Sequence, residues 1–137
     1  MADSGRPDIA AIMGVVEIAW GGIWLLKDFF GIIRTFSYGI GAGLLSMLDI
    51  ILMGMLLAAG ILLIKNKKTA IDVNRYYVFG SAGMIMILII YLIVTLGTLG
   101  LMASFIAVLL KAIIPALVLL LVVFNDEVTG FYASQAQ

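Results

Sequence analysis

Three ionisable residues lie inside long apolar stretches of the sequence: Glu17, Asp49 and Lys111. A charge in apolar surroundings is costly, so such residues usually mark an ion or substrate pathway or pair with an opposite charge. Glu17 shares a helical face with Trp20 and Trp24, because offsets of three and seven residues return to one side of a helix. A carboxylate beside two indole rings could hold a cation.

Lys111 precedes a proline by four residues. Pro115 has no N–H to give to the Lys111 carbonyl, so we expect the helix to kink there and to expose a polar backbone group beside the charge. A charge beside a kink could form a substrate site, and there are two alternative interpretations. In the first, which we favour, Lys111 pairs with Glu17 or Asp49 across a helical bundle and fixes the order of the helices without binding anything. In the second, the helices are shifted, and some of these charges face a polar surface of an assembly.

The chain that carries these residues is too apolar for a water-soluble globule of its size. It has 137 residues, of which 64% are hydrophobic and 12% are charged, and its mean hydropathy is +1.24. Soluble domains are about half apolar and about a quarter charged. The composition therefore excludes a conventional soluble enzyme and a disordered chain, and it indicates a protein surrounded by lipid or by copies of itself.

Four apolar stretches, at residues 9–33, 39–64, 76–97 and 101–124, are each long enough to span a membrane, which takes about 20 helical residues. No alternation with a period of two occurs, so helices are favoured over a β-barrel. Gly97 and Gly100 break the uncharged run from Tyr76 to Leu110, which predicts a tight turn between antiparallel helices. The sequence thus predicts an all-α, very hydrophobic, membrane-protein-like four-helix bundle in one domain, residues 1–137, with polar tails at 1–8 and 125–137.

The sequence contains no cysteine and no histidine. Their absence removes disulfides, thiolate nucleophiles, imidazole bases and the usual ligands of zinc, copper and haem. Eight basic and eight acidic residues give a formal net charge of 0, so no field of the whole molecule draws in nucleic acid. We therefore expect neither an enzyme nor a bound cofactor or metal.

The densest positive charge lies between the second and third apolar stretches, at Lys65, Lys67, Lys68 and Arg75. By the positive-inside rule this loop is cytoplasmic and both termini share its side, although Lys27, Asp28 and Arg34 place charge in the first loop as well. The four basic residues could also contact lipid headgroups or nucleic acid phosphates, because a lattice multiplies a weak local patch by its copy number. Non-specific contact with DNA therefore remains open.

Small residues recur within the apolar stretches, where they let helix backbones approach closely. Gly54 and Ala58 have the small-xxx-small spacing that favours helix packing, and Gly80 and Gly83 lie on the third apolar stretch. We expect these four residues at helix contacts in a bundle that packs against many neighbours, including copies of itself.

In its length, in its four apolar helices and in the acidic residue on the first of them, the chain resembles small multidrug transporters. The resemblance implies that Glu17 takes the place of their essential carboxylate. The chain differs from these transporters because it has no tryptophan in the third apolar stretch, and because Asp49 and Lys111 have no counterpart there. The solute that such a protein would transport is left open.

Over its whole length the chain also looks like the very hydrophobic, all-helical major capsid proteins of archaeal tailed spindle-shaped viruses. The matching features are 20 Ile and 21 Leu, no cysteine, five Asn and Gln together, and the short polar tails Met1–Asp8 and Asn125–Gln137. The resemblance implies a subunit without catalytic residues that passes through the host membrane and then assembles into a protein shell around DNA.

Our leading hypothesis is therefore a self-assembling viral coat subunit that forms a helical or spindle-shaped shell in the virion. Its partners would be many copies of itself and, before assembly, membrane lipid. The alternative is a small integral membrane transporter or channel subunit that uses Glu17, Asp49 and Lys111. A third hypothesis is an accessory subunit of a membrane complex. The sequence leaves open whether lipid or protein covers the apolar surface.

Overall fold

The computed structural model describes residues 5–135, apart from the side chains of Leu101, Ala103 and Ser104. In chain order it contains α1 (Asp8–Ser37), α2 (Ile40–Ile64), α3 (Ala70–Leu96), α4 (Thr98–Val118), the π-helix η1 (Leu119–Val123) and α5 (Asp126–Ala133). No strand occurs within residues 5–135, so the expected all-α fold is confirmed. Residues 1–4 and 136–137 of the expected polar tails lie outside the described part.

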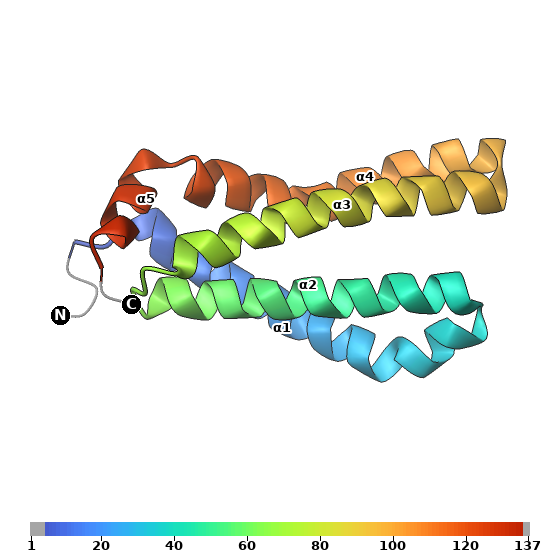
Figure 1. The fold of residues 1–137 in the computed structure, drawn as a ribbon, viewed down its shortest axis with the longest axis horizontal. Helices are drawn as coiled ribbons and strands as arrows, with labels where there is room; N and C mark the ends of the chain where they lie inside the picture. The colour runs from blue at the N-terminus through green and yellow to red at the C-terminus, as the bar shows by residue number, and fades with distance from the viewer. Residues whose placement is uncertain (1–4, 136–137) are drawn as a thin grey trace.

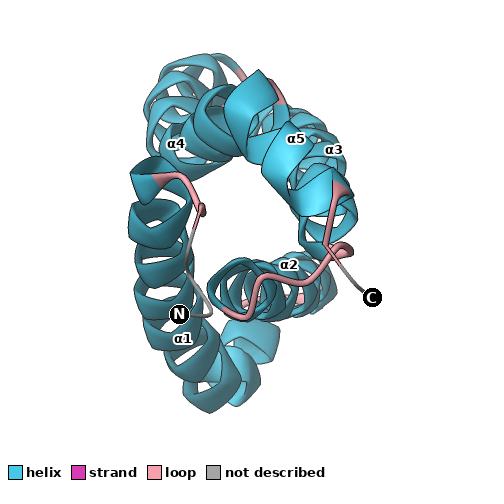
Figure 2. Cartoon of the chain, turned by 90° about the vertical axis from the view of Figure 1, so that its left-hand side faces the viewer, coloured by secondary structure: helices cyan, strands magenta, loops and turns pink. Residues whose placement is uncertain are grey.

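Two antiparallel hairpins, α1–α2 and α3–α4, lie side by side, with α2 packed on both α1 and α3 (Figure 1). The loop at residues 65–69 and α5 lie at one end of the bundle, where α1 begins; we call this the terminal end. The turns at Tyr38–Gly39 and at Gly97 lie at the opposite end, the turn end. In the view along the bundle, α5 lies at the terminal end against η1 and α3 (Figure 2).

Four helical segments are long and apolar enough to cross a membrane: Asp8–Ser37, Ile40–Ile64, Ala70–Leu96 and Thr98–Val123. They coincide in number and order with the four apolar stretches of the sequence. Much of their apolar surface is exposed, since only 11% of the apolar window of α3 is buried within the chain. Lipid or other protein molecules have to cover this surface, because apolar patches of such extent are not stable in water.

The first helix is longer than the apolar stretch that predicts it. Instead of ending near residue 33, α1 continues to Ser37, and the chain turns at Gly39, where φ is 135°. Lysine and arginine are good helix formers, so charged residues do not by themselves end a helix. The expected placement of Lys27, Asp28 and Arg34 in the first loop is therefore wrong, and all three lie on α1.

The third helix begins earlier than expected, at Ala70 instead of residue 76. Ile71, Asn74 and Tyr77 are buried at a spacing of three residues, so continued helix turns one face of this segment into the bundle. Arg75, which we expected in the loop, is consequently on α3.

Part of the expected C-terminal polar tail is the short helix α5. The side chain of Asn125 caps it by accepting hydrogen bonds from the N–H groups of Glu127 and Val128. Val128 and Tyr132, four residues apart, are fully buried, and the Tyr132 hydroxyl donates a hydrogen bond to the Leu63 carbonyl. The tail assignment is therefore wrong for residues 126–133, because this segment docks on the end of the bundle.

The tight turn between the last two long helices is confirmed and is even shorter than expected. Gly97 alone separates α3 from α4, with a φ of 63° that favours glycine. Gly100 lies in the first turn of α4, where a Cβ would stand 2.2 Å from the carbonyl oxygen of Leu92. Only glycine permits this close approach of the two backbones.

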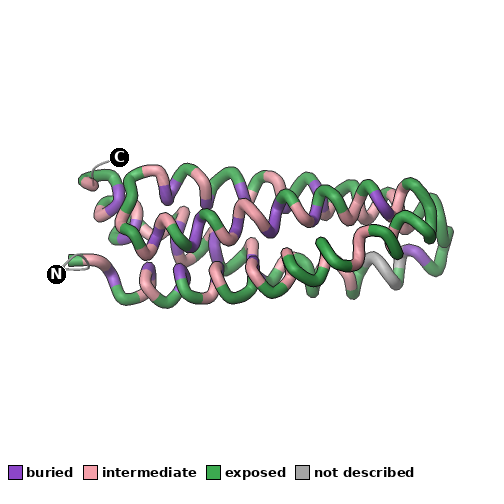
Figure 3. The backbone as a smooth tube through the Cα atoms, turned by 90° about the horizontal axis from the view of Figure 1, so that it is seen from below, coloured by how far each residue is buried: buried purple, intermediate pink, exposed green. Residues whose placement is uncertain are grey.

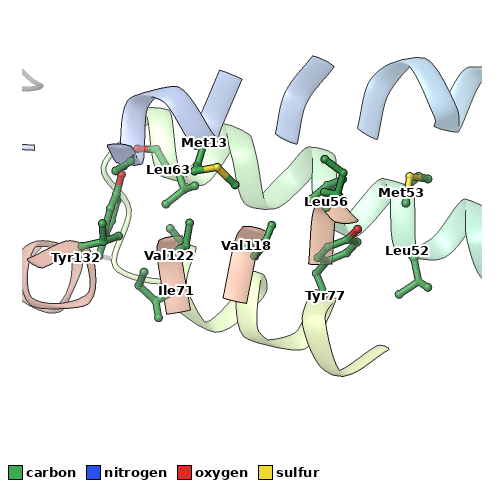
Figure 4. Close-up of a cluster of buried hydrophobic side chains, with 14 of the residues drawn as sticks. Met13, Leu52, Met53, Leu56, Leu63, Ile71, Tyr77, Val118, Val122 and Tyr132 are labelled. Atoms are coloured by element: carbon green, nitrogen blue, oxygen red, sulfur yellow. Dashed lines mark hydrogen bonds between the residues drawn. The ribbon is translucent and has the colours of Figure 1, made fainter. Parts of the chain in front are cut away.

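The hydrophobic core lies mainly toward the terminal end. Its fully buried side chains include Leu56, Leu63, Val118, Val122 and Tyr132, which come from α2, from the end of α4, from η1 and from α5 (Figure 4). The turn end carries mostly exposed residues (Figure 3). The bundle is thus well packed in one half and open in the other.

Glycines bring α1 and α2 together, but they are not the ones that the sequence spacing singles out. A Cβ on Gly60 would lie 2.7 Å from the carbonyl oxygen of Gly14, and a Cβ on Gly21 would lie 2.8 Å from the backbone nitrogen of Leu57. These glycines allow the two helix backbones to touch.

Of the four small residues expected at helix contacts, only Gly80 meets a neighbouring helix within the chain. A Cβ there would lie 2.7 Å from Leu52 Cδ2, whereas nothing lies within 4 Å of a Cβ on Gly54 or Gly83. Ala58 is exposed. The expectation is wrong within the chain for Gly54, Ala58 and Gly83, because residue spacing does not show which face of a helix turns inward.

Candidate functional site

An ion pair joins two of the helices that are long and apolar enough to span a membrane. Nζ of Lys111 on α4 lies 3.2 Å from Oδ1 of Asp49 on α2 and donates a hydrogen bond to it. The Asp49 side chain is 10% exposed and that of Lys111 is 44% exposed. Lys111 therefore pairs with one of its two expected partners, Asp49, and not with Glu17. The hydrogen-bonded pair costs less in apolar surroundings than either charge would alone.

A second carboxyl group, that of Asp28 on α1, lies beside the ion pair. It lines the same pocket as Asp49 and Lys111. Its Oδ2 atom is buried and has no hydrogen-bond partner among residues 5–135. Asp28 thus adds to the pocket lining a carboxyl group of which one oxygen is left unsatisfied by the described chain.

Sequence reasoning did not identify Asp28 as a site residue, because it placed Asp28 in a loop. Helical spacing contains the missing signal. Asp28 follows Gly21 by seven residues, or two helical turns, and Gly21 packs on α2. Extending the first helix past its charges would have placed Asp28 on the inward face.

A pocket of about 230 Å³, which we call the outer pocket, surrounds these charges. All four long helices contribute to its lining. Its polar lining residues are Asp28, Thr35, Ser46, Asp49 and Lys111. It is large enough for several water molecules or a small ligand.

A smaller cavity of about 30 Å³, which we call the inner cavity, lies between α2, α3 and α4. Its polar lining residues are Asp49, Tyr77, Ser81 and Lys111. Its volume suits about one water molecule. Asp49 and Lys111 therefore belong to both spaces.

The formal charges around the outer pocket do not balance. Two carboxylates, Asp28 and Asp49, face the single ammonium group of Lys111, which leaves one net negative charge. An uncompensated charge between helices in a membrane is costly. One further positive charge, with hydrogen-bond donors to reach the carboxylate oxygens, would balance the site.

Glu17 does not join this cluster. Its side chain is fully buried, and no hydrogen-bond donor among the described residues reaches either of its carboxyl oxygens. It lies at the contact of α1 with α2, where a Cβ on Gly60 would be 2.9 Å from Glu17 Cβ, and it lines neither the outer pocket nor the inner cavity. The structure thus brings together two of the three ionisable residues singled out in the sequence.

The expected cation site between Glu17 and two tryptophans is not formed. Glu17 is fully buried at the contact of α1 with α2, whereas Trp20, three residues farther along, is 40% exposed. The rings of Trp20 and Trp24 lie 5.7 Å apart, and the Lys27 ammonium group lies 4.2 Å from the Trp24 ring. The cation at the Trp24 ring is therefore Lys27 of the chain itself.

A π-helix follows the proline at which the sequence predicts a kink. α4 continues through Pro115 to Val118 and then changes into the π-helix η1. The N–H of Phe124 donates to the Leu119 carbonyl across five residues. Such π-helical turns are rare in proteins, and those that occur are often found at functional sites.

The basic residues expected to contact phosphates or headgroups lie at the terminal end. Lys65, Lys67 and Lys68 are exposed in the loop between α2 and α3. Arg75 is exposed on α3, where its guanidinium group lies 3.6 Å from the Asp72 carboxylate. Contact with a membrane surface or with DNA at this end stays a prediction.

Within residues 5–135, no group of three or more acidic, histidine or cysteine residues could hold a metal ion. Comparison of the chain with protein-family models, with curated proteins and with solved structures finds no match. The chemistry of the outer pocket is therefore the basis on which function is assigned.

Proposed function

We propose that the protein is an integral membrane protein that binds a single positive charge, a proton or a small monovalent cation, in the outer pocket, and that it conducts this ion or a coupled solute. One observation carries the proposal: Asp28, Asp49 and Lys111 line one pocket, and all three lie on helices able to span a membrane. Ionisable residues inside such helices usually belong to an ion or substrate pathway.

The charge of the site defines the class of ligand. The pocket has one carboxylate more than it has ammonium groups, and Asp28 Oδ2 lacks a hydrogen-bond donor among the described residues. A proton shared between the two carboxyl groups satisfies this imbalance. An ammonium-type cation satisfies it as well, because it brings one charge and several donors.

The exposed lysines at the terminal end favour one orientation of the protein in the bilayer. Lys65, Lys67 and Lys68 lie on the loop between two spanning helices, and the positive-inside rule places such a loop in the cytoplasm. The outer pocket extends from Asp49 toward the turn end, which then faces the other side of the membrane.

Transport by the purified protein in lipid vesicles tests the proposal. Radiolabelled methylammonium serves as the cation, and a pH-sensitive dye trapped in the vesicles reports proton flux. We expect saturable methylammonium uptake, proton flux or both, and each of Asp28→Asn and Asp49→Asn should reduce it by about tenfold or more, which is the rate equivalent of one lost charge-assisted interaction.

A matched control is Asp72→Asn, because Asp72 is exposed at the terminal end and outside the pocket. Its transport should equal that of the unaltered chain. Absence of both fluxes in the unaltered protein, or equal rates in all three variants, would exclude the outer pocket as the transport site.

The second candidate remains a self-assembling coat subunit that passes through a membrane before it forms a virion shell around DNA. The observation in its favour is the exposed apolar surface, such as that of Ile87, Ile90 and Val94 on α3, which identical neighbours could cover as well as lipid. Contacts that do not close into a ring would propagate into a helical or tubular array.

Electron cryo-microscopy of the purified protein separates the two candidates. A coat subunit forms an ordered array once detergent is removed, whereas a transporter forms isolated small oligomers. An array that forms in equal yield with Asp28→Asn and Asp49→Asn, together with no measurable flux, would favour the coat subunit.

A further inference from the structure

The outer pocket and the inner cavity meet at the Asp49–Lys111 ion pair. They share four lining residues: Asp49, Met84, Leu88 and Lys111. On α2, the outer pocket is lined by residues 42–49 and the inner cavity by residues 49–53. Because α2 runs from the turn end to the terminal end, the two spaces lie one after the other along the bundle, with the ion pair between them.

The two spaces differ in size and in access. The outer pocket has a volume of about 230 Å³ and the inner cavity one of about 30 Å³. Tyr77 and Ser81, which supply polar groups to the inner cavity, are 1% and 5% exposed. The inner cavity is thus a small, mainly apolar space in which Tyr77 and Ser81 offer polar groups to an ion or water that enters past the ion pair.

Lys111 is placed to act as a movable part of this boundary. Its side chain is 44% exposed and reaches Asp49 through a single contact of 3.2 Å. A lysine stem is long and flexible, so the ammonium group can leave Asp49 without a change in the helix backbone. Pro115 and η1 follow on the same helical segment and interrupt its regular hydrogen bonding, which lowers the cost of bending it.

We propose that Lys111 closes the passage between the outer pocket and the inner cavity by occupying Asp49, and that a monovalent cation arriving at Asp28 and Asp49 displaces it and joins the two spaces. The second half of this inference depends on the proposed cation site. The ligand and the lysine compete for the same carboxylate, so binding of one is linked to release of the other. In the closed state the Lys111 ammonium group therefore occupies the position at Asp49 that the cation takes in the open state.

Because the chain contains no cysteine, single cysteines can report access to each space. Ser81→Cys places a thiol in the inner cavity and Ser46→Cys places one in the outer pocket, both with little change in volume. The rate of alkylation by iodoacetamide, a small neutral reagent, is measured for each variant in lipid vesicles, alone and combined with Lys111→Met. Circular dichroism verifies that every variant keeps its helices.

We expect Lys111→Met to accelerate alkylation at Ser81→Cys by about tenfold or more, the effect of removing roughly one strong charged contact, and to leave Ser46→Cys unchanged. Equal rates at Ser81→Cys with and without Lys111→Met would overturn the closed passage. So would alkylation at Ser81→Cys that is as fast as at Ser46→Cys while Lys111 is intact.

A second measurement keeps Lys111 and adds the cation. Saturating ammonium chloride should accelerate alkylation at Ser81→Cys, whereas choline chloride at equal ionic strength should not. If Lys111→Met opens the cavity but ammonium does not, the passage stands and its control by a cation is overturned. If methylammonium and proton flux are also absent, the proposed function fails while the closed passage remains.

Discussion

The terminal half and the turn half of the bundle share the same helices but are built differently. In the terminal half, Leu56, Val118 and Tyr132 are fully buried, and α5 closes the end. In the turn half the buried residues are fewer (Figure 3). The outer pocket opens there between all four long helices. The difference indicates that the terminal half stabilises the fold, whereas the turn half leaves space for a ligand.

The two halves also differ in the burial and pairing of their ionisable residues. The packed half contains a single buried acid, Glu17, without a hydrogen-bond partner among the described residues. The open half contains the paired and partly accessible cluster of Asp28, Asp49 and Lys111. A binding site needs access and exchangeable partners, and only the second arrangement offers both.

The largest expected effect is on packing in the terminal half. Leu56→Ala removes a fully buried side chain and should lower the free energy of unfolding by about 2–5 kcal/mol. Leu44→Ala, on the same helix but 52% exposed, should change it by less than about 0.5 kcal/mol. Circular dichroism of both variants during SDS titration of detergent micelles measures the difference. Similar losses would show that the two halves are equally packed.

The ion pair of the open half should have a smaller effect. Lys111→Met leaves Asp49 uncompensated, but Lys111 is 44% exposed, so the loss should be below the roughly 3–5 kcal/mol of a fully buried pair. The double variant Lys111→Met with Asp49→Leu should recover much of that loss, because both charges are then absent. Single and double variants that are both as stable as the unaltered chain would show that the contact contributes nothing to the fold.

Two glycines on α2, one at a helix contact and one away from any, allow a comparison within one helix. The expected changes in stability are similar in size to that of the ion pair. A Cβ on Gly60 would meet the Gly14 carbonyl oxygen at 2.7 Å, so Gly60→Ala should separate α1 from α2 and cost about 1–3 kcal/mol. Gly54→Ala meets nothing within 4 Å and should gain up to roughly 1 kcal/mol through helix propensity. The free energy of unfolding of both variants, measured in the same detergent micelles, tests this difference. A loss at Gly54→Ala would place that residue at a contact with lipid or with another copy of the chain.

The sequence predicted the helices better than it predicted the site. Composition and the length of the apolar stretches were enough to predict four helices long and apolar enough to span a membrane, and the hairpin at Gly97, because these depend on local properties of the chain. Asp28 was missed because its charge was counted with those of the first loop. The helix α5 was missed because its stability comes from docking Val128 and Tyr132 on other helices.

The choice of partners within the site needed the three-dimensional structure. Glu17 and Asp49 are both acids within apolar stretches, and nothing local distinguishes the one that faces Lys111 on a helix 62 residues farther along. Gly54 and Ala58 have the spacing of a packing motif, but the rotation of α2 about its axis turns them away from its neighbours. Helix rotation and pairing depend on the whole bundle, which is why periodicity alone did not assign them.

The smallest expected effect concerns the closure of the terminal half by α5. Tyr132→Phe removes the hydroxyl that donates to the Leu63 carbonyl and should cost about 0.5–1.5 kcal/mol. Tyr76→Phe, at a tyrosine that is 61% exposed, should cost less than about 0.5 kcal/mol.

The dependence on pH tests whether Tyr132 is buried as the docking of α5 requires. Burial raises the pKa of Tyr132 from 10.0 to about 12, with a further increase from Glu17 and an opposing effect of Arg6. Between those two values the unfolded chain has lost the phenolic proton that the folded chain keeps, so this contribution to stability decreases as the pH rises from 10 to 12. Tyr132→Phe lacks this contribution. The difference in the free energy of unfolding between this variant and the unaltered chain should therefore narrow as the pH rises over that range. A gap that stays constant from pH 9 to pH 12 would mean that Tyr132 titrates alike in the folded and unfolded chains, and that α5 does not seal the terminal half.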